Sequence, residues 1–141
     1  MKALSLCLLA ALVLANVATA QLGGLYTINP IAPTGGTNYT ALADAVNDLL
    51  TQGVAAPCIF EIFDDGGPYT GSMPFLSNNV GWAPSTAVLV LGQWTGASAT
   101  NRVTFRAATG ESPVFDASSN SMGVFWNGAD YVTLEGIEII N

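Results

Sequence analysis

Short apolar segments, separated by turns rich in Gly, Pro, Asn and Ser, recur through most of the sequence. They cover residues 25–28, 58–63, 73–76, 87–91, 103–106, 113–116, 124–126, 131–135 and 137–140. Segments this short predict strands, because a typical helix needs a longer periodic run. In the second half they lie roughly ten residues apart, a spacing found in sandwiches, barrels and solenoids. We therefore expect an all-β fold.

One internal echo favours the solenoid. Residues 103–107 (VTFRA) and 132–136 (VTLEG) share a pattern at a shift of 29 residues, with three expected strands in each period. A coil of a parallel β-helix has this form. Strand side chains alternate between the two faces, so the residues expected inside are Val103, Phe105, Val132 and Leu134. Those expected outside are Arg102, Thr104, Arg106, Tyr131, Thr133 and Glu135, with Glu135 beside Arg106 on the next coil.

Between residues 40 and 53 the apolar period changes to that of a helix. Its apolar stripe consists of Leu42, Val46, Leu49 and Leu50. We expect Asn38 or Thr40 to cap the amino end of this helix and Gly53 to end it. It is the one helix expected in the mature chain.

The first 20 residues have the features of a secretory signal peptide. Lys2 supplies a positive charge, residues 3–17 are almost wholly apolar, and small residues precede Gln21. The apolar run is shorter than the roughly 20 residues that a membrane-spanning helix needs, and no later segment replaces it. We expect cleavage near Ala20-Gln21 and a mature chain, residues 21–141, that has no membrane span and is secreted or held at the cell surface.

The mature chain is strongly acidic, since Arg102 and Arg106 are its only cations against ten carboxylates. Nucleic acid is a poor partner for such a chain, because phosphate binding draws on clustered Lys and Arg. The same charge weakens the binding of polyanionic sugars unless a divalent cation bridges the two. Neutral polysaccharides and surface proteins remain as expected partners.

The residue inventory excludes several kinds of chemistry. There is no histidine, and Cys58 is the only cysteine after residue 20, which excludes Ser-His-Asp and Cys-His pairs, an internal disulfide and zinc held by His or Cys clusters. We expect Cys58 to be buried in a strand. Arg102 and Arg106 are poor lyase bases, because arginine rarely deprotonates. We assign no catalytic residue.

Carboxylates and aromatic rings supply the remaining site candidates. A glycosidase pair could come from Glu61, Asp116, Asp130, Glu135 and Glu138, although sequence spacing does not fix the distance between two carboxylates. Asp64 and Asp65, in a Gly-rich turn, are candidate calcium ligands, and no other cofactor is expected. Trp82 and Trp94 lie in polar, Gly-containing segments, so they are candidates for stacking on sugar rings, against the alternative of core packing.

A set of short motifs covers nearly all of the mature chain. They are residues 26–28, the Gly35-Gly36 turn, and residues 39–46, 60–62, 69–70, 101–106 and 130–136. Together they resemble the start of secreted bacterial right-handed parallel β-helix proteins of the pectin-lyase-like superfamily. The resemblance implies an amphipathic helix, with a strand before it, capping about two coils of a solenoid. The sequence departs from the pattern at residues 64–68, a longer turn, and 77–86, an inserted loop.

Three hypotheses about function remain open. The first is a non-catalytic amino-terminal cap and scaffold of a secreted or surface β-helix protein, in contact with glycans or surface proteins. The second is the front fragment of a polysaccharide lyase or glycoside hydrolase, because catalytic residues of the superfamily lie on later coils. The third is a small β-sandwich binding module. We also expect that residues 137–140 leave an open edge, typical of a truncated solenoid, that can pair with another chain.

Overall fold

The computed structural model describes residues 20–75 and 85–141 of the chain. Three predictions fall wholly or mostly on the other residues: the signal peptide, the ligand-binding role of Trp82 and the inserted loop at residues 77–86. They lie outside the described residues and stay predictions.

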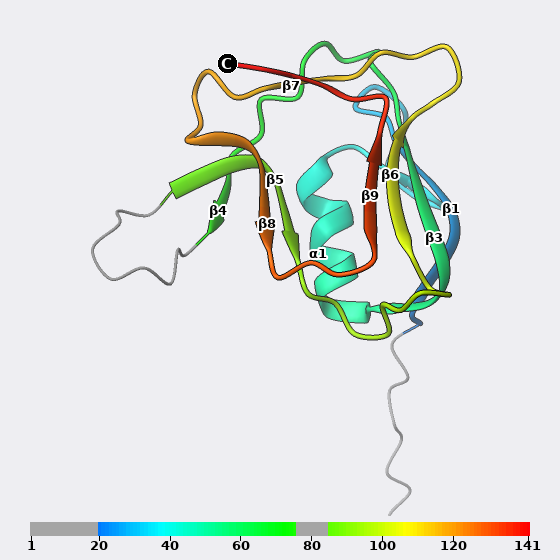
Figure 1. Cartoon of the computed structure of the whole chain (residues 1–141). Helices are drawn as coiled ribbons and strands as arrows, with labels where there is room; N and C mark the ends of the chain where they lie inside the picture. The colour runs from blue at the N-terminus through cyan, green and yellow to red at the C-terminus, as the bar shows by residue number, and fades with distance from the viewer. Residues whose placement is uncertain (1–19, 76–84) are drawn as a thin grey trace, which may run out of the picture.

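The described chain is mostly β, with one α-helix (Figure 1). The helix is α1 (Leu42–Gln52). The strands are β1 (Leu22–Ile28), β2 (Asn38–Tyr39), β3 (Val54–Ile62), β4 (Met73–Phe75), β5 (Ser85–Gly92), β6 (Val103–Ala107), β7 (Val114–Asp116), β8 (Met122–Asn127), β9 (Val132–Glu135) and β10 (Glu138–Ile140).

The strands form three sheets in which parallel pairing dominates. The first sheet has the order β2-β1-β3-β6-β9, and all of its pairs are parallel. The second is the parallel pair β10-β7, and the third has the order β4-β5-β8, with only β4 running antiparallel to its neighbour. The expectation of an all-β chain is met, and the pairing is not that of a sandwich built from antiparallel hairpins.

From β3 onward, the chain visits the three sheets in rotation. After β3 it passes Tyr69, which is bridged to Phe115 of β7, and then forms β4 and β5 in the third sheet. It returns to the first sheet as β6, and the sequence β7, β8, β9, β10 repeats the same order. Val103 pairs with Val132 and Phe105 with Leu134, so the register predicted from the 29-residue echo is confirmed.

The core follows from this register, because equivalent residues of neighbouring strands lie one above another. Tyr26, Phe60 and Phe105 form a column in which consecutive ring centroids are 5.4 and 4.8 Å apart. Phe60 and Phe105 are fully buried, whereas Leu134 at the end of the column is only partly covered. Cys58 is buried, as predicted.

Helix α1 packs against β1, β2 and β5, with its apolar stripe inward. The buried residues of the helix are Leu42, Ala45, Val46 and Leu49. Leu50 was expected in this stripe and is instead half exposed, because it follows Leu49 directly and points about 100° away from it. Gly53 ends the helix as predicted, with a φ of 70° and its N–H donating to the Leu49 carbonyl oxygen.

The predicted amino-terminal cap of the helix is wrong. Ala41 occupies the cap position, and no side chain there accepts a hydrogen bond from the first turn. Asn38 belongs to β2, and its side-chain amide donates to carbonyl oxygens of the loop at residues 29–33. The Thr40 hydroxyl pairs with that of Thr34. Both candidates are used to hold the preceding loop, so neither is free to cap α1.

Candidate functional site

Among the described residues, the exposed tryptophan and tyrosine rings do not include that of Trp94. Trp94 is only 4% exposed, and its Nε1 is buried without a hydrogen-bond partner among the described residues. It packs in the core, which is the alternative to sugar stacking stated above for this residue. Trp126 of β8 and Tyr131, just before β9, are 49% and 44% exposed. Trp126 lies on the last strand of its sheet and Tyr131 directly precedes the last strand of another, and no further strand of the described residues covers either ring.

The two arginines are engaged by neighbouring strands. Arg106 Nη2 lies 2.7 Å from Glu61 Oε1, and Arg102 Nη2 donates to Thr133 Oγ1 at 3.5 Å. Glu135 is the register partner of Arg106 on β9, as predicted, but the ion pair forms with Glu61 of β3 on the other side. This arrangement leaves Arg106 as a structural cation rather than a base.

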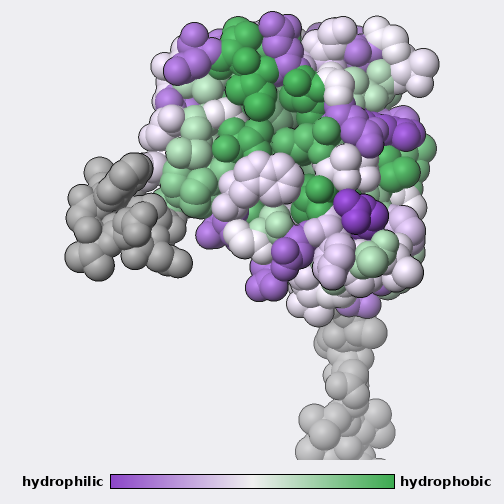
Figure 2. All heavy atoms as spheres, viewed as in Figure 1, coloured by the Kyte–Doolittle hydropathy of each residue, from purple (hydrophilic) through white to green (hydrophobic). Residues whose placement is uncertain are grey.

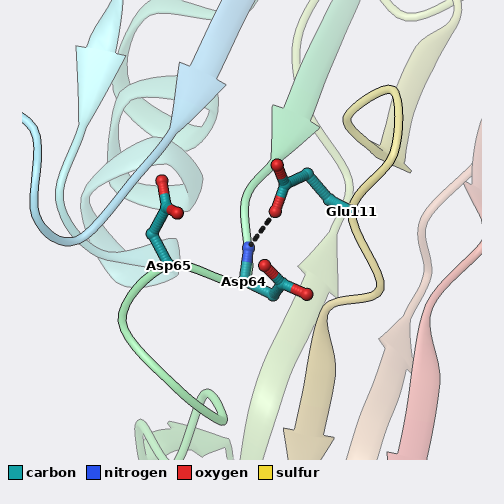
Figure 3. A group of neighbouring side chains, drawn as sticks. All are labelled: Asp64, Asp65 and Glu111. Atoms are coloured by element: carbon teal, nitrogen blue, oxygen red, sulfur yellow. Dashed lines mark hydrogen bonds between the residues drawn. The ribbon is translucent and has the colours of Figure 1, made fainter.

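A cluster of three carboxylates forms where two turns meet (Figure 3). Asp64 and Asp65 follow β3, and Glu111 comes from the turn between β6 and β7; one oxygen of each lies within 4.8 Å of the others. Sequence reasoning found the two aspartates and missed Glu111. It lies 47 residues from Asp64 in the sequence, and only the stacking of the two turns brings them together.

Hydrogen bonds explain how the carboxylate cluster is held. Asp64 donates its backbone N–H to Glu111 Oε2 at 3.2 Å, and Asp64 Oδ2 accepts from the Ser112 N–H at 3.1 Å. Asp65 Oδ2 accepts from the Asn29 side-chain amide at 2.9 Å. These hydrogen bonds connect the turn after β3 to the turn that contains Glu111 and Ser112 and to the loop that begins at Asn29. The cluster therefore has a structural role in linking neighbouring turns.

The pKa values of the pair respond to this contact in opposite directions. A hydrogen bond between the two carboxyl side chains, helped by the Ser112 N–H, lowers the pKa of Asp64. The same side-chain contact raises the pKa of Glu111 and outweighs the Asp64 backbone N–H, which acts in the opposite direction. Glu111 is therefore the carboxyl group that holds a proton more readily. Calcium takes about 6 to 8 oxygen ligands, so a cation here would need ligands beyond these side chains. The calcium ligation expected of Asp64 and Asp65 stays a prediction.

Two grooves run along α1, and both are lined mainly by apolar and small residues. One, of about 210 Å³, lies between the start of the helix and the segment at residues 66–73. The other, of about 250 Å³, is lined by Val46, Leu50, Met73, Pro74 and Val90 with three small or polar neighbours. No carboxylate, thiol or amine lines either groove, and the polar side chains that line the first one carry hydroxyls, such as that of Tyr69.

The most distinctive surface is the end of the molecule formed by β8, β9 and β10, here called the terminal edge. Each of these strands stands at an end of its sheet, and β8 and β9 lie on either side of α1 in the view of Figure 1, with the last residues running across the top to the carboxyl end. Its exposed apolar residues are Trp126, Tyr131, Ile139 and Ile140. Figure 2 shows apolar side chains gathered on this face with hydrophilic ones around them. A surface of this kind is typical of an interaction site.

No family model, curated protein or solved structure matches the chain. Within residues 20–75 and 85–141, no helix is long and apolar enough to cross a membrane.

Proposed function

We propose that this chain is a non-catalytic cap and scaffold, the first coils of a right-handed parallel β-helix in a secreted or surface protein. The observation that carries the proposal is the rotation of consecutive strands through three sheets, with parallel register from β3 to β6 to β9. A right-handed path is the usual one for parallel strands joined by a crossover.

The cap is supported by the contrast between the two ends of the first sheet. At one end β2 pairs along only two residues, and α1 packs over β1 and β2 with its apolar stripe inward. A solenoid needs such cover, because its first coil would otherwise present apolar side chains and unpaired strand edges to water. At the other end no strand of the described residues pairs with the outer edge of β9, so the described coils are covered at one end only.

A non-catalytic role is supported by what the charged side chains do. Arg106 is paired with Glu61, Arg102 contacts Thr133, and Asp64 and Glu111 hold two turns together. The exposed rings of Trp126 and Tyr131 are the groups available to stack on a glycan. Incubation of the mature chain with neutral and acidic polysaccharides should release no reducing or unsaturated ends. Release of either would overturn the non-catalytic proposal.

Export is the second part of the proposal, and it rests on the sequence of residues 1–20. The full-length chain should be processed to a product that begins at Gln21 when it is produced in a secreting bacterial host. Mass spectrometry of the exported protein measures this directly. A product that keeps Met1 and stays inside the cell would contradict the proposed location.

Engineered disulfides test the proposed architecture. Thr104 and Thr133 are register partners on β6 and β9, so cysteines at both positions of the mature chain carrying Cys58→Ala should oxidise readily to a disulfide. The control pair places cysteines at Thr104 and Glu135, two residues further along β9. Its Cα atoms would be about 8 Å apart, beyond the roughly 7 Å that a disulfide tolerates. Equal oxidation of both pairs, or of neither, would overturn the parallel register.

A further inference from the structure

A column of alternating charge runs along the outer face of the first sheet. Glu61 on β3 is in register with Arg106 on β6, and Arg106 is in register with Glu135 on β9. Arg106 forms its ion pair with Glu61 at 2.7 Å. Glu135 ends the column exposed, and the described part of the chain places no cation beyond it. A residue on a further strand opposite Glu135 would continue the alternation if it carried a positive charge.

The terminal edge as a whole carries the same sign as Glu135. Asp130, Glu135 and Glu138 are all exposed there. The two arginines of the described residues lie on β6 or just before it, one strand deeper, and already contact Glu61 and Thr133. A partner strand that lies against β9 therefore meets the Arg102 guanidinium only beside Thr133. Opposite Glu135 it meets an exposed carboxylate, which favours a basic residue at that position of the partner.

The other columns of the sheet specify the rest of the partner strand. Beside the charge column run Cys58, Val103 and Val132, then Ile59, Thr104 and Thr133, then Phe60, Phe105 and Leu134. Val132 and Leu134 are only partly buried, so an added strand would cover them. Continuing each column gives a strand that reads apolar, Thr, large apolar, basic.

We propose that β9 binds a parallel peptide strand of a partner chain, with this pattern and with Arg or Lys opposite Glu135. The inference rests on the proposed scaffold, since it assigns a partner to the open end of that scaffold. Main-chain hydrogen bonds would supply affinity, and the apolar and basic positions would supply selection, as in other cases of strand addition to a sheet edge.

A second copy of this chain is a poorer occupant at neutral pH. Two β9 strands related by a twofold axis would run antiparallel and bring the carboxylates of both copies to one seam, where like charges destabilise the pair. A head-to-tail contact would meet the other end of the sheet, which is covered by α1 and the two-residue strand β2.

The test uses the mature chain and two synthetic peptides with blocked ends. The first has the sequence of residues 101–109, whose Arg106 holds the basic position of the pattern. The second is identical except for the change Arg106→Glu. NMR spectra of the isotope-labelled protein should show shifts in the β9 amides, with the Arg peptide binding about threefold to fivefold more tightly, the range expected for one cross-strand charge pair.

The protein variant Glu135→Lys is the matched control, and it should reverse the preference between the two peptides. The inference would be overturned by equal binding of the two peptides, by shifts away from β9, by no shift at millimolar peptide, or by a dimer of the free protein at β9 at neutral pH. The Thr104–Thr133 disulfide separates the two proposals. If the disulfide forms and the peptides do not bind, the proposed scaffold is retained and the proposed peptide site is rejected. If the disulfide does not form, both proposals are rejected.

Discussion

At the scale of single residues, the tightest approach lies where the turn after β5 meets the start of β3. The Val54 N–H donates to the Thr95 carbonyl oxygen at 2.8 Å, and Gly96 follows with a φ of 87°. A Cβ at Gly96 would overlap the Val54 carbonyl oxygen. Glycine is required there twice over, by its backbone conformation and by the space available.

Gly110 offers a matched control, because its φ is 88° and a Cβ there would meet nothing within 4 Å. Gly110→Ala should therefore lose only the left-handed penalty of about 1–2 kcal/mol. Gly96→Ala should lose more, since the turn must also move away from β3. Urea unfolding followed by tryptophan fluorescence measures both, and equal losses would show that the contact with Val54 is unimportant.

The Asp64–Glu111 pair predicts a dependence of stability on pH. The lowered pKa of Asp64 gives stability that is present above its ordinary value of 3.8 and is lost as pH falls through the lowered pKa. The raised pKa of Glu111 gives stability that is present below its ordinary value of 4.5 and is lost as pH rises through the raised pKa. The pair therefore contributes most near pH 4 and less at neutral pH.

Glu111→Gln removes the titrating group and keeps a similar shape. The unfolding midpoint in urea of the unmodified chain should fall more between pH 4.5 and pH 7 than that of the variant, when both are measured at a concentration where they are monomeric. The difference between the two pH dependences isolates Glu111 from the other carboxylates. Parallel curves would contradict the assignment.

At the scale of elements, the positions of strands could be predicted and some of their ends could not. The strand expected at residues 58–63 begins earlier, at Val54, because Val54 pairs with Leu22 of β1 across a register irregularity. Ala55, Ala56 and Pro57 carry no strand signal of their own. Their conformation comes from a neighbour about 30 residues earlier, and local sequence does not encode it.

The helix was predictable because its apolar period is local, and its packing gives a sharp test. Leu49 is fully buried under the sheets, and the adjacent Leu50 is 52% exposed. Leu49→Ala should cost about 2–5 kcal/mol of unfolding free energy, and Leu50→Ala about 1 kcal/mol or less. Urea titrations of the two variants compare them at constant helix propensity. Similar losses of unfolding free energy in the two variants would mean that the Leu49 face of α1 does not pack against the sheets as described.

At the scale of the whole molecule, the contacts that sequence reasoning missed join strands and turns that are neighbours in space and far apart in the sequence. The 29-residue echo relates β6 to β9 and places Glu135 beside Arg106. The step from β3 to β6 pairs Cys58 with Val103, 45 positions later, because β4 and the residues before β5 lengthen the connection. No repeat marks this longer step, so neither the Glu61–Arg106 pair nor the approach of Glu111 to Asp64 could be predicted.

Two properties of the terminal edge have opposite effects on self-association: its unpaired strands and apolar side chains favour it, and its negative charge opposes it. The terminal edge offers unpaired strands and the apolar side chains of Ile139 and Ile140, which favours pairing with any other edge. The chain has a net charge of −7, and Asp130, Glu135 and Glu138 lie on that edge. At neutral pH repulsion between carboxylates opposes the self-association expected of an open edge, so the molecule should be monomeric there.

Sedimentation velocity should therefore show a monomer at pH 7 and growing association as pH falls toward about 4, where Asp and Glu side chains become neutral. Ile139→Lys supplies the control, because Ile139 is half exposed on β10 and a lysine on an edge strand blocks pairing. This variant should stay monomeric over the same pH range, since its charge persists in acid. Association of the variant equal to that of the unmodified chain would place the contact on another surface, and the terminal edge would lose its role in self-association.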